Sequence, residues 1–194
     1  MKIYILECND IKVNALKEAF KGQDVEVVKG DFVSFMETHD VECVVSPANA
    51  FGIMDGGYDL AIRSYFGYDL QINVQEYILN HYYGEQPLGT SFIIDIKDGK
   101  KLIHTPTMRV PSKIKDPLIV YQAMRTTLMC AKENKVKSIV IPFFGTGTGR
   151  VGMRMAADLM LLALKSINHP KLVTDWSDVD DFAERLDIYS WLID

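Results

Sequence analysis

Residues 44–62 read Val44-Val45-Ser46-Pro47-Ala48-Asn49-Ala50-Phe51-Gly52-Ile53-Met54-Asp55-Gly56-Gly57-Tyr58-Asp59-Leu60-Ala61-Ile62, and they decide the predicted fold. The apolar run over 41–45 predicts a buried strand, and the amphipathic residues from Leu60 onward predict a helix. The loop between them carries an amide, a glycine pair and two carboxylates. Open α/β sheets bind ligands at such loops, which lie at the carboxyl ends of strands beside the free N–H groups of a helix. The segment therefore predicts an α/β protein with a ligand site at this loop.

A second glycine-rich loop follows the apolar residues of 136–144. It reads Gly145-Thr146-Gly147-Thr148-Gly149-Arg150-Val151-Gly152, and a helix is predicted over 153–167. A strand, a glycine-rich loop and a helix in this order can hold phosphate oxygens on backbone N–H groups. Each glycine alone also fits a tight turn, and Asp59 alone fits a first-turn acid favoured by the helix dipole. Function is inferred from the two loops together.

The second loop fits one nucleotide-binding motif in part and lacks another. Gly147, Gly149 and Gly152 satisfy G-x-G-x-x-G, but only 42 residues follow, too few for the remaining strands of a doubly wound dinucleotide fold. No Walker G-x-x-x-x-G-K-[ST] sequence occurs. The histidines are scattered and no C-x-x-C or H-E-x-x-H spacing is present, so we predict neither a metal nor a cofactor.

The composition limits the class of partner. The chain has 194 residues, 48% of them hydrophobic, and a formal net charge of −5. This length suits one domain, and the net charge excludes charge-driven binding to nucleic acid or to an anionic membrane surface. The three cysteines are expected to be reduced thiols, and no apolar run is long enough to span a bilayer, so a cytoplasmic location is predicted. The oligomeric state is left open.

The remaining pattern completes an alternating α/β arrangement. Two strands around Asp98-Gly99 are predicted to pair antiparallel, because this dipeptide is typical of a hairpin turn. Asp31 is predicted to cap a short helix, and His104 to be a hydrogen-bonded structural residue. The predicted strands cover 3–6, 25–28, 41–45, 92–96, 102–105 and 136–144, and the predicted helices begin near residues 9, 32, 60, 68, 116 and 153.

Several fragments together resemble the macro domain family, whose members bind ADP-ribose. Gly30-Asp31-Phe32 is similar to the family's Gly-Asp-Ile, and Ser46-Pro47-Ala48-Asn49 is similar to its Asn-Ala-Ala-Asn. Gly56-Gly57-Tyr58-Asp59-Leu60-Ala61-Ile62 is similar to its Gly-Gly-Val-Asp-Gly-Ala-Ile, and 143–149 is similar to its second phosphate loop. The resemblance implies a three-layer α/β/α macro-domain-like fold with a mixed central sheet over residues 1–168. In detail it is nearest to a phage and bacterial branch of poorly defined activity.

The resemblance also implies a site. Asp31 and the Phe32 N–H would contact adenine, Asn49 would contact the distal ribose, and Asp59 would act through a water in a hydrolytic member. Asn49 and Asp59 are thus the implied catalytic residues. The other implied ligand-binding residues form the loops that would hold the pyrophosphate: Ala48, Gly56, Gly57, Phe144, Gly145, Thr146, Gly147, Thr148 and Gly149. The partner would be ADP-ribose or an ADP-ribosylated macromolecule.

Three other functions remain open at this stage. The chain could bind ADP-ribose without catalysis, act as a phosphatase on ADP-ribose 1''-phosphate, or be an unrelated nucleotide- or NAD-binding module. Ser46, Asp55 and Leu60 depart from the family pattern, and Asp55 would repel a pyrophosphate if it pointed inward. Residues 169–194 are predicted to form an acidic helical extension packed on the same domain.

Overall fold

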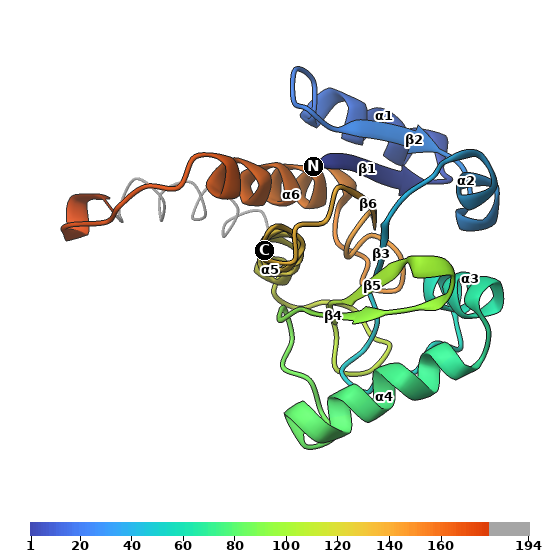
Figure 1. Ribbon diagram of the computed structural model, residues 1–194. Helices are drawn as coiled ribbons and strands as arrows, with labels where there is room; N and C mark the ends of the chain where they lie inside the picture. The colour runs from blue at the N-terminus through green and yellow to red at the C-terminus, as the bar shows by residue number, and fades with distance from the viewer. Residues whose placement is uncertain (179–194) are drawn as a thin grey trace.

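The computed structural model describes residues 1–178, and it contains a six-stranded sheet between two layers of helices (Figure 1). The strand order is β2-β1-β6-β3-β5-β4. The elements are β1 Lys2–Glu7, α1 Asp10–Ala19, β2 Glu26–Lys29, α2 Phe32–Thr38, β3 Cys43–Ser46, α3 Gly57–Phe66, α4 Asp69–Tyr82, β4 Phe92–Asp95, β5 Lys101–His104, α5 Leu118–Glu133, β6 Ser138–Pro142 and α6 Met153–Asn168.

The sheet is mixed, as predicted. All neighbouring strands pair parallel except β4 and β5, which pair antiparallel with Ile93 opposite Ile103. The connection between β4 and β5 contains a short 3₁₀ turn over Lys97–Gly99, in which Asp98 takes a left-handed conformation with φ of 61°. The predicted hairpin is therefore confirmed, with a longer turn than the dipeptide alone indicated.

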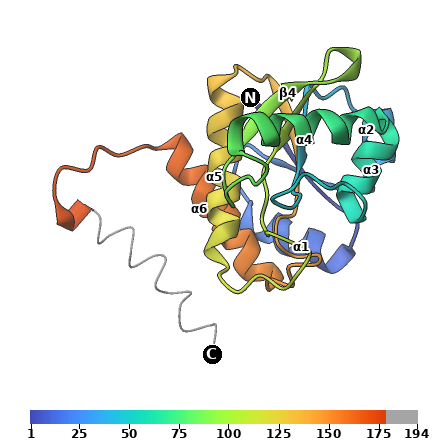
Figure 2. The same ribbon diagram turned by 90° about the horizontal axis from the view of Figure 1, so that it is seen from below.

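Two apolar cores fill the spaces on either side of the sheet. One lies between the sheet and α1, α5 and α6, and the other between the sheet and α2, α3 and α4. Figure 2 shows α5 and α6 on one side of the sheet and α2 and α3 on the other. The central strands contribute side chains to both cores, which is why their sequences are continuously apolar rather than alternating. Val44 and Val45, for example, are fully buried in opposite cores.

Side-chain caps begin two of the helices. Asn9 accepts hydrogen bonds from the backbone N–H groups of Ile11 and Lys12 at the start of α1. Asp31 accepts from Ser34 at the start of α2, as predicted. After α6, residues 169–178 extend away from the body of the molecule, and Leu172 and Trp176 are exposed (Figure 1). Residues 179–194 lie outside the described part, so the packed C-terminal extension stays a prediction.

The sheet order brings the two glycine loops together. β3 and β6 are neighbours and run parallel, with Val44 opposite Val140. The loops that follow them therefore leave the same edge of the sheet side by side, although they are nearly ninety residues apart in sequence.

Candidate functional site

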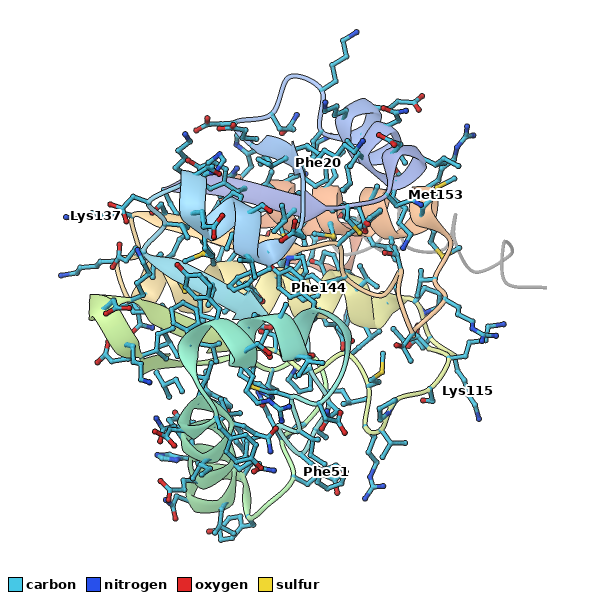
Figure 3. The ribbon with its side chains drawn as sticks, turned by 90° about the vertical axis from the view of Figure 1, so that its right-hand side faces the viewer. Phe20, Phe51, Lys115, Lys137, Phe144 and Met153 are labelled. Atoms are coloured by element: carbon cyan, nitrogen blue, oxygen red, sulfur yellow. The ribbon has the colours of Figure 1, made fainter. Side chains whose placement is uncertain are left out.

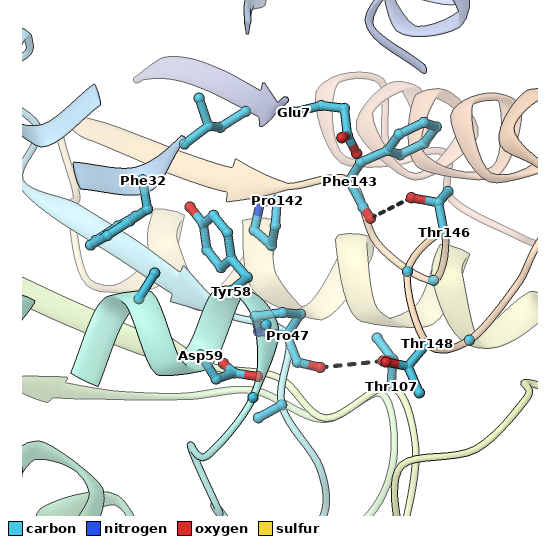
Figure 4. A pocket seen from close by; sticks show the side chains of 18 of the residues that line it. Glu7, Phe32, Pro47, Tyr58, Asp59, Thr107, Pro142, Phe143, Thr146 and Thr148 are labelled. Carbon is cyan, nitrogen blue, oxygen red and sulfur yellow. Dashed lines mark hydrogen bonds between the residues drawn. The ribbon is translucent and has the colours of Figure 1, made fainter. Parts of the chain in front are cut away.

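A cavity of about 580 Å³ opens at the carboxyl ends of the central strands, and we call it the cleft. Residues of the loop after β3 line one wall, and residues 145–149 line the facing wall (Figure 4). The ends of β1 and β2 close one end of the cleft, where Leu6, Glu7, Cys8, Gly30 and Asp31 lie. The cleft thus joins in one space the segments that the sequence singled out separately. The predicted site residues that line it are Asp31, Phe32, Ala48, Asn49, Gly56, Gly57, Asp59, Gly145, Thr146, Gly147, Thr148 and Gly149.

Phe144 is the one predicted ligand-binding residue that does not line the cleft. Its side chain is fully buried in the core beneath α5 and α6, between the layers of the fold (Figure 3). Its neighbour Phe143 lines the cleft instead. The Phe144 side chain therefore anchors the loop to the core, and a ligand contact by its backbone stays a prediction.

Asn49 organises the first loop from within. Its side-chain Nδ2 donates to the Ile53 carbonyl at 2.7 Å, and its Oδ1 accepts from the backbone N–H groups of Phe51 and Ile53. The backbone N–H of Ala50 donates to the Met108 carbonyl, which ties the loop to the segment after β5. The Asn49 amide therefore fixes the shape of the cleft wall while the residue lines the cleft.

Asp59 lies in the first turn of α3 and faces the end of β3. Its Oδ1 accepts a 2.6 Å hydrogen bond from the hydroxyl of Ser46, a fully buried residue. Burial raises the pKa of the Asp59 carboxyl to about 7, although the hydrogen bonds from Ser46 and from the Ala48 backbone oppose this shift. Ser46, a departure from the family pattern, is thus a direct partner of the carboxyl group. A carboxyl group with a pKa near 7 is suited to exchange a proton at neutral pH.

Asp31, Phe32 and Tyr58 lie together at the end of the cleft that β1 and β2 close. Both Asp31 oxygens are engaged by Ser34, at 3.0 Å to its N–H and 2.7 Å to its hydroxyl, and these bonds hold the pKa of Asp31 below its usual value. The Phe32 ring packs edge-on against Tyr58, with 5.4 Å between ring centroids. Apolar side chains beside one carboxylate suit a heterocycle with a polar edge.

The glycines of the second loop differ in what their backbone requires. A Cβ at Gly149 would lie 2.5 Å from Ile114 Cδ1 and 2.7 Å from the Gly145 carbonyl oxygen, and a Cβ at Gly145 would lie 2.7 Å from Val120. Packing therefore requires glycine at both positions. A Cβ at Gly147 would meet nothing within 4 Å, and the same holds for Gly56 in the first loop. At Gly147 and Gly56 the missing side chain leaves open space in the cleft walls.

Sequence reasoning missed the residues that reach the cleft from other parts of the chain. Lys12 from α1 lines the cleft, and so do Thr107, Met108 and Pro111 from the segment after β5. Local sequence carries no signal for these contacts, because they depend on how the sheet is ordered. Arg109, from the same segment, lies outside the cleft lining and forms a two-point ion pair with Glu85.

His104 has a structural role. His104 is fully buried, and its Nδ1 lies 2.6 Å from Gln86 Oε1. Burial lowers its pKa to about 3, so it is neutral, as predicted for a structural histidine.

Within residues 1–178, no group of three or more histidine, cysteine, aspartate or glutamate side chains could hold a metal ion. Over the same range, none of the helices combines the length and apolar character needed to cross a bilayer.

Comparison with known families and proteins agrees with this geometry. The family model described as Macro domain matches residues 45–160, a range that includes both glycine loops. An uncharacterized protein of Aquifex aeolicus (strain VF5) is 30% identical over 142 residues, which cover 71% of this chain and 79% of that protein. A second relative, from Sulfurisphaera tokodaii, is 28% identical over 143 residues and covers 73% of this chain and 74% of its own length.

Solved structures share the fold. The macrodomain of Mycobacterium tuberculosis DarG superposes with a TM-score of 0.61 at 18% identity, covering 72% of this chain and 89% of that chain. The Oceanobacillus iheyensis macrodomain with ADP gives 0.59 at 22% identity, covering 79% and 86%. Thermosipho africanus DarTG in complex with ADP-ribose gives 0.55 at 16% identity, covering 88% of this chain and 54% of that one.

Proposed function

The chain belongs to the macro domain family, and on that basis we propose that its cleft binds ADP-ribose. One observation carries the proposal: the two glycine loops face each other across a single cavity, and each has a glycine whose missing side chain leaves open space. Backbone N–H groups in such loops can approach phosphate oxygens directly. Related structures were solved with ADP and with ADP-ribose bound, which supports the same ligand here.

The cleft has two different ends, and these support one orientation of the ligand. Asp31, Phe32 and Tyr58 form the end suited to adenine. Asn49 and Asp59 lie on the first loop and the helix that follows it, where the distal ribose would lie. The pyrophosphate would then lie between the loops, near Gly56 and Gly147. This arrangement assigns a chemically matched surface to each part of the molecule.

We further propose that the protein hydrolyses the bond between the distal ribose and an acceptor group. Asp59 would accept a proton from a water, the water oxygen would bond to the anomeric carbon, and the acceptor would leave with the bonding electrons and take up a proton. The pKa near 7 favours this role over binding alone, because a general base is most effective when its pKa lies near the working pH.

Binding is tested by titration calorimetry with ADP-ribose, NAD and AMP. We expect ADP-ribose to bind most tightly, because only it fills both ends of the cleft and presents a free distal ribose. If no binding of ADP-ribose is detected at millimolar concentration, the proposed function is wrong. Tighter binding of NAD would instead indicate a different nucleotide-binding module.

Hydrolysis is tested by release of ADP-ribose from a mono-ADP-ribosylated protein. Asp59→Asn should slow release by about 10²- to 10⁴-fold, the usual contribution of a general base, while ADP-ribose affinity is retained. Asp24→Asn is the matched control, because Asp24 is exposed and precedes β2 at the opposite edge of the sheet from the cleft. Wild-type protein that binds but releases nothing would be a reader of ADP-ribose. A parallel assay on ADP-ribose 1''-phosphate tests the phosphatase alternative.

A cytoplasmic location is part of the proposal. Cys8, Cys43 and Cys130 are all free within the described residues, as expected where thiols are kept reduced. Labelling of unreduced protein from cell extract with a thiol reagent should modify Cys8, the exposed one of the three.

A further inference from the structure

Lys12 is the one basic side chain in the lining of the cleft, as far as residues 1–178 define it. The same lining contains four carboxylates, Glu7, Asp31, Asp55 and Asp59. A ligand with a pyrophosphate group brings further negative charge into this space. The cleft therefore needs a positive charge near the phosphates, and only one side chain of the lining can supply it.

The Lys12 ammonium group is held against the second glycine loop. Its Nζ donates to the Thr146 carbonyl oxygen at 3.0 Å, across 134 positions in sequence. The Lys12 side chain is 28% exposed, so it is open to the cleft. Figure 4 shows Thr146 on the same side of the pocket as Glu7 at the end of β1. The ammonium group thus lies at the loop that would hold the phosphates.

Glu7 lies near the Lys12 ammonium group but does not take up its hydrogen-bond donors. The Glu7 Oε2 lies 3.9 Å from Lys12 Nζ, longer than the 2.7 to 2.9 Å typical of a charge-assisted hydrogen bond. Glu7 Oε1 is engaged elsewhere, because it accepts from the backbone N–H groups of Cys8 and Asn9 at 2.9 Å each. A lysine ammonium has three N–H donors, and the Thr146 carbonyl is its hydrogen-bonded partner among the described residues. Donor capacity therefore remains for an incoming anion.

We propose that Lys12 binds a phosphate group of the ligand and thereby supplements the backbone N–H groups of the second glycine loop. The inference rests on the proposed function for the identity of the ligand, and it adds to that function a charged contact made by a side chain from α1. It also accounts for how a cleft with four carboxylates can accept a dianion. Binding should consequently depend on the phosphates of the ligand and on ionic strength.

Lys12→Met is the direct test, because methionine keeps the apolar stem and removes the charge. We expect this variant to bind ADP-ribose about tenfold to a hundredfold more weakly, the loss typical of one hydrogen bond to a charged group. Adenosine, which has no phosphate, should bind equally to both proteins. Lys17→Met is the matched control, since Lys17 is exposed on the same helix and should leave both affinities unchanged.

The salt dependence of ADP-ribose affinity distinguishes a ligand contact by Lys12 from a purely structural role. If Lys12 contacts the ligand, wild-type affinity for ADP-ribose should fall more steeply than that of Lys12→Met between 0.05 and 0.5 M salt, because screening weakens the contact. Lys12→Arg should retain part of the affinity and the salt dependence. Equal affinity in wild type and Lys12→Met would overturn the inference. So would equal losses for ADP-ribose and adenosine with an unchanged salt dependence, since these would show that Lys12 only holds the Thr146 carbonyl.

Inorganic pyrophosphate keeps this test independent of the proposed function. If wild-type protein does not bind ADP-ribose, the proposed function fails, and pyrophosphate then decides the role of Lys12. Stabilisation of wild type by pyrophosphate in a thermal melt, reduced in Lys12→Met and retained in Lys17→Met, would support it. No stabilisation of wild type, or equal stabilisation of wild type and Lys12→Met, would overturn it.

Discussion

Asp59→Asn should make the protein more stable at neutral pH while it removes the proposed catalytic group. Burial moves the pKa of this carboxyl from an ordinary 3.8 to about 7, a change of roughly 3 units. At about 1.4 kcal/mol per unit, the charged carboxylate lowers the free energy of unfolding by up to about 4 kcal/mol above pH 7. Asparagine carries no charge, and its Oδ1 can still accept from the Ser46 hydroxyl. Its amide nitrogen cannot accept from the Ala48 N–H, which offsets about 1 kcal/mol of the gain.

The direction with pH follows from the raised pKa. The folded wild-type protein binds the Asp59 proton more tightly than the unfolded chain does, so this group's contribution to stability is complete below pH 3.8. It is lost as the pH rises through about 7. The stability advantage of Asp59→Asn over wild type should therefore grow between pH 4 and pH 7 and stay constant above it. Other groups titrate equally in both proteins and cancel in the difference.

Urea unfolding followed by circular dichroism at several pH values from 4 to 8 measures this difference. Asp31→Asn is an informative control because its pKa is lowered by Ser34, which reverses the sign. Its carboxylate contributes stability that is present above the ordinary pKa and lost as the pH falls, so Asp31→Asn should be less stable than wild type at neutral pH. A difference between Asp59→Asn and wild type that does not vary with pH would show that the Asp59 carboxyl is not buried as described, and the reasoning for a general base would fall with it.

Three further predictions concern the cleft and its support. Gly147→Ala should leave the melting temperature near that of wild type and weaken ADP-ribose binding, measured by calorimetry, whereas Gly149→Ala should lower the melting temperature because its Cβ would lie 2.5 Å from Ile114. Phe144→Ala should reduce the free energy of unfolding by about 3 to 5 kcal/mol in urea titrations, the usual cost of emptying a buried aromatic site; a change below 1 kcal/mol would contradict its place in the core. Release of ADP-ribose at saturating substrate should fall about tenfold per pH unit below about 7, and a rate independent of pH between 5 and 8 would exclude Asp59 as the base.

The sequence predicted the strands and helices well because their patterns are local. The six predicted strands all occur, and the helix predicted to begin near residue 32 is α2. The predicted and observed strand boundaries differ at residues that are buried but not paired with a neighbouring strand. Val41 is fully buried, as an apolar strand residue should be, but β3 begins only at Cys43. An apolar side chain indicates that a residue is buried. Whether the residue belongs to a strand also depends on hydrogen bonds to a neighbouring strand in register. Strand ends therefore shift by one or two residues.

The order of the strands could not be read from local pattern. β6 lies between β1 and β3, although it is the last strand in sequence. The resemblance to a family implied a mixed central sheet without this order, and the meeting of the two glycine loops depends on the order. The contact from Lys12 to Thr146 depends on it too, because β1, which precedes α1, pairs with β6. Residues of this kind become visible only when the fold is assembled.

The role of Ser46 shows how a departure from a family pattern can be informative. From the sequence, serine in place of asparagine only weakened the match. In the structure its hydroxyl is 2.6 Å from the carboxyl group on which the proposed chemistry depends, 13 residues away. The turn from β3 into α3 brings Ser46 and Asp59 together. Their residue types alone do not predict this contact.

The packing of the fold does not require glycine at position 147. Glycine costs a folded chain up to about 1 kcal/mol relative to alanine, because the unfolded chain has more conformations to lose. Gly145 and Gly149 offset this cost because they allow close packing against Val120 and Ile114. The fold therefore needs both glycines whether or not a ligand is bound. Gly147 has no such contact, and its φ lies outside the left-handed range that would require glycine. Under the proposed function, glycine at position 147 leaves room for the phosphates of the ligand at this point of the cleft lining.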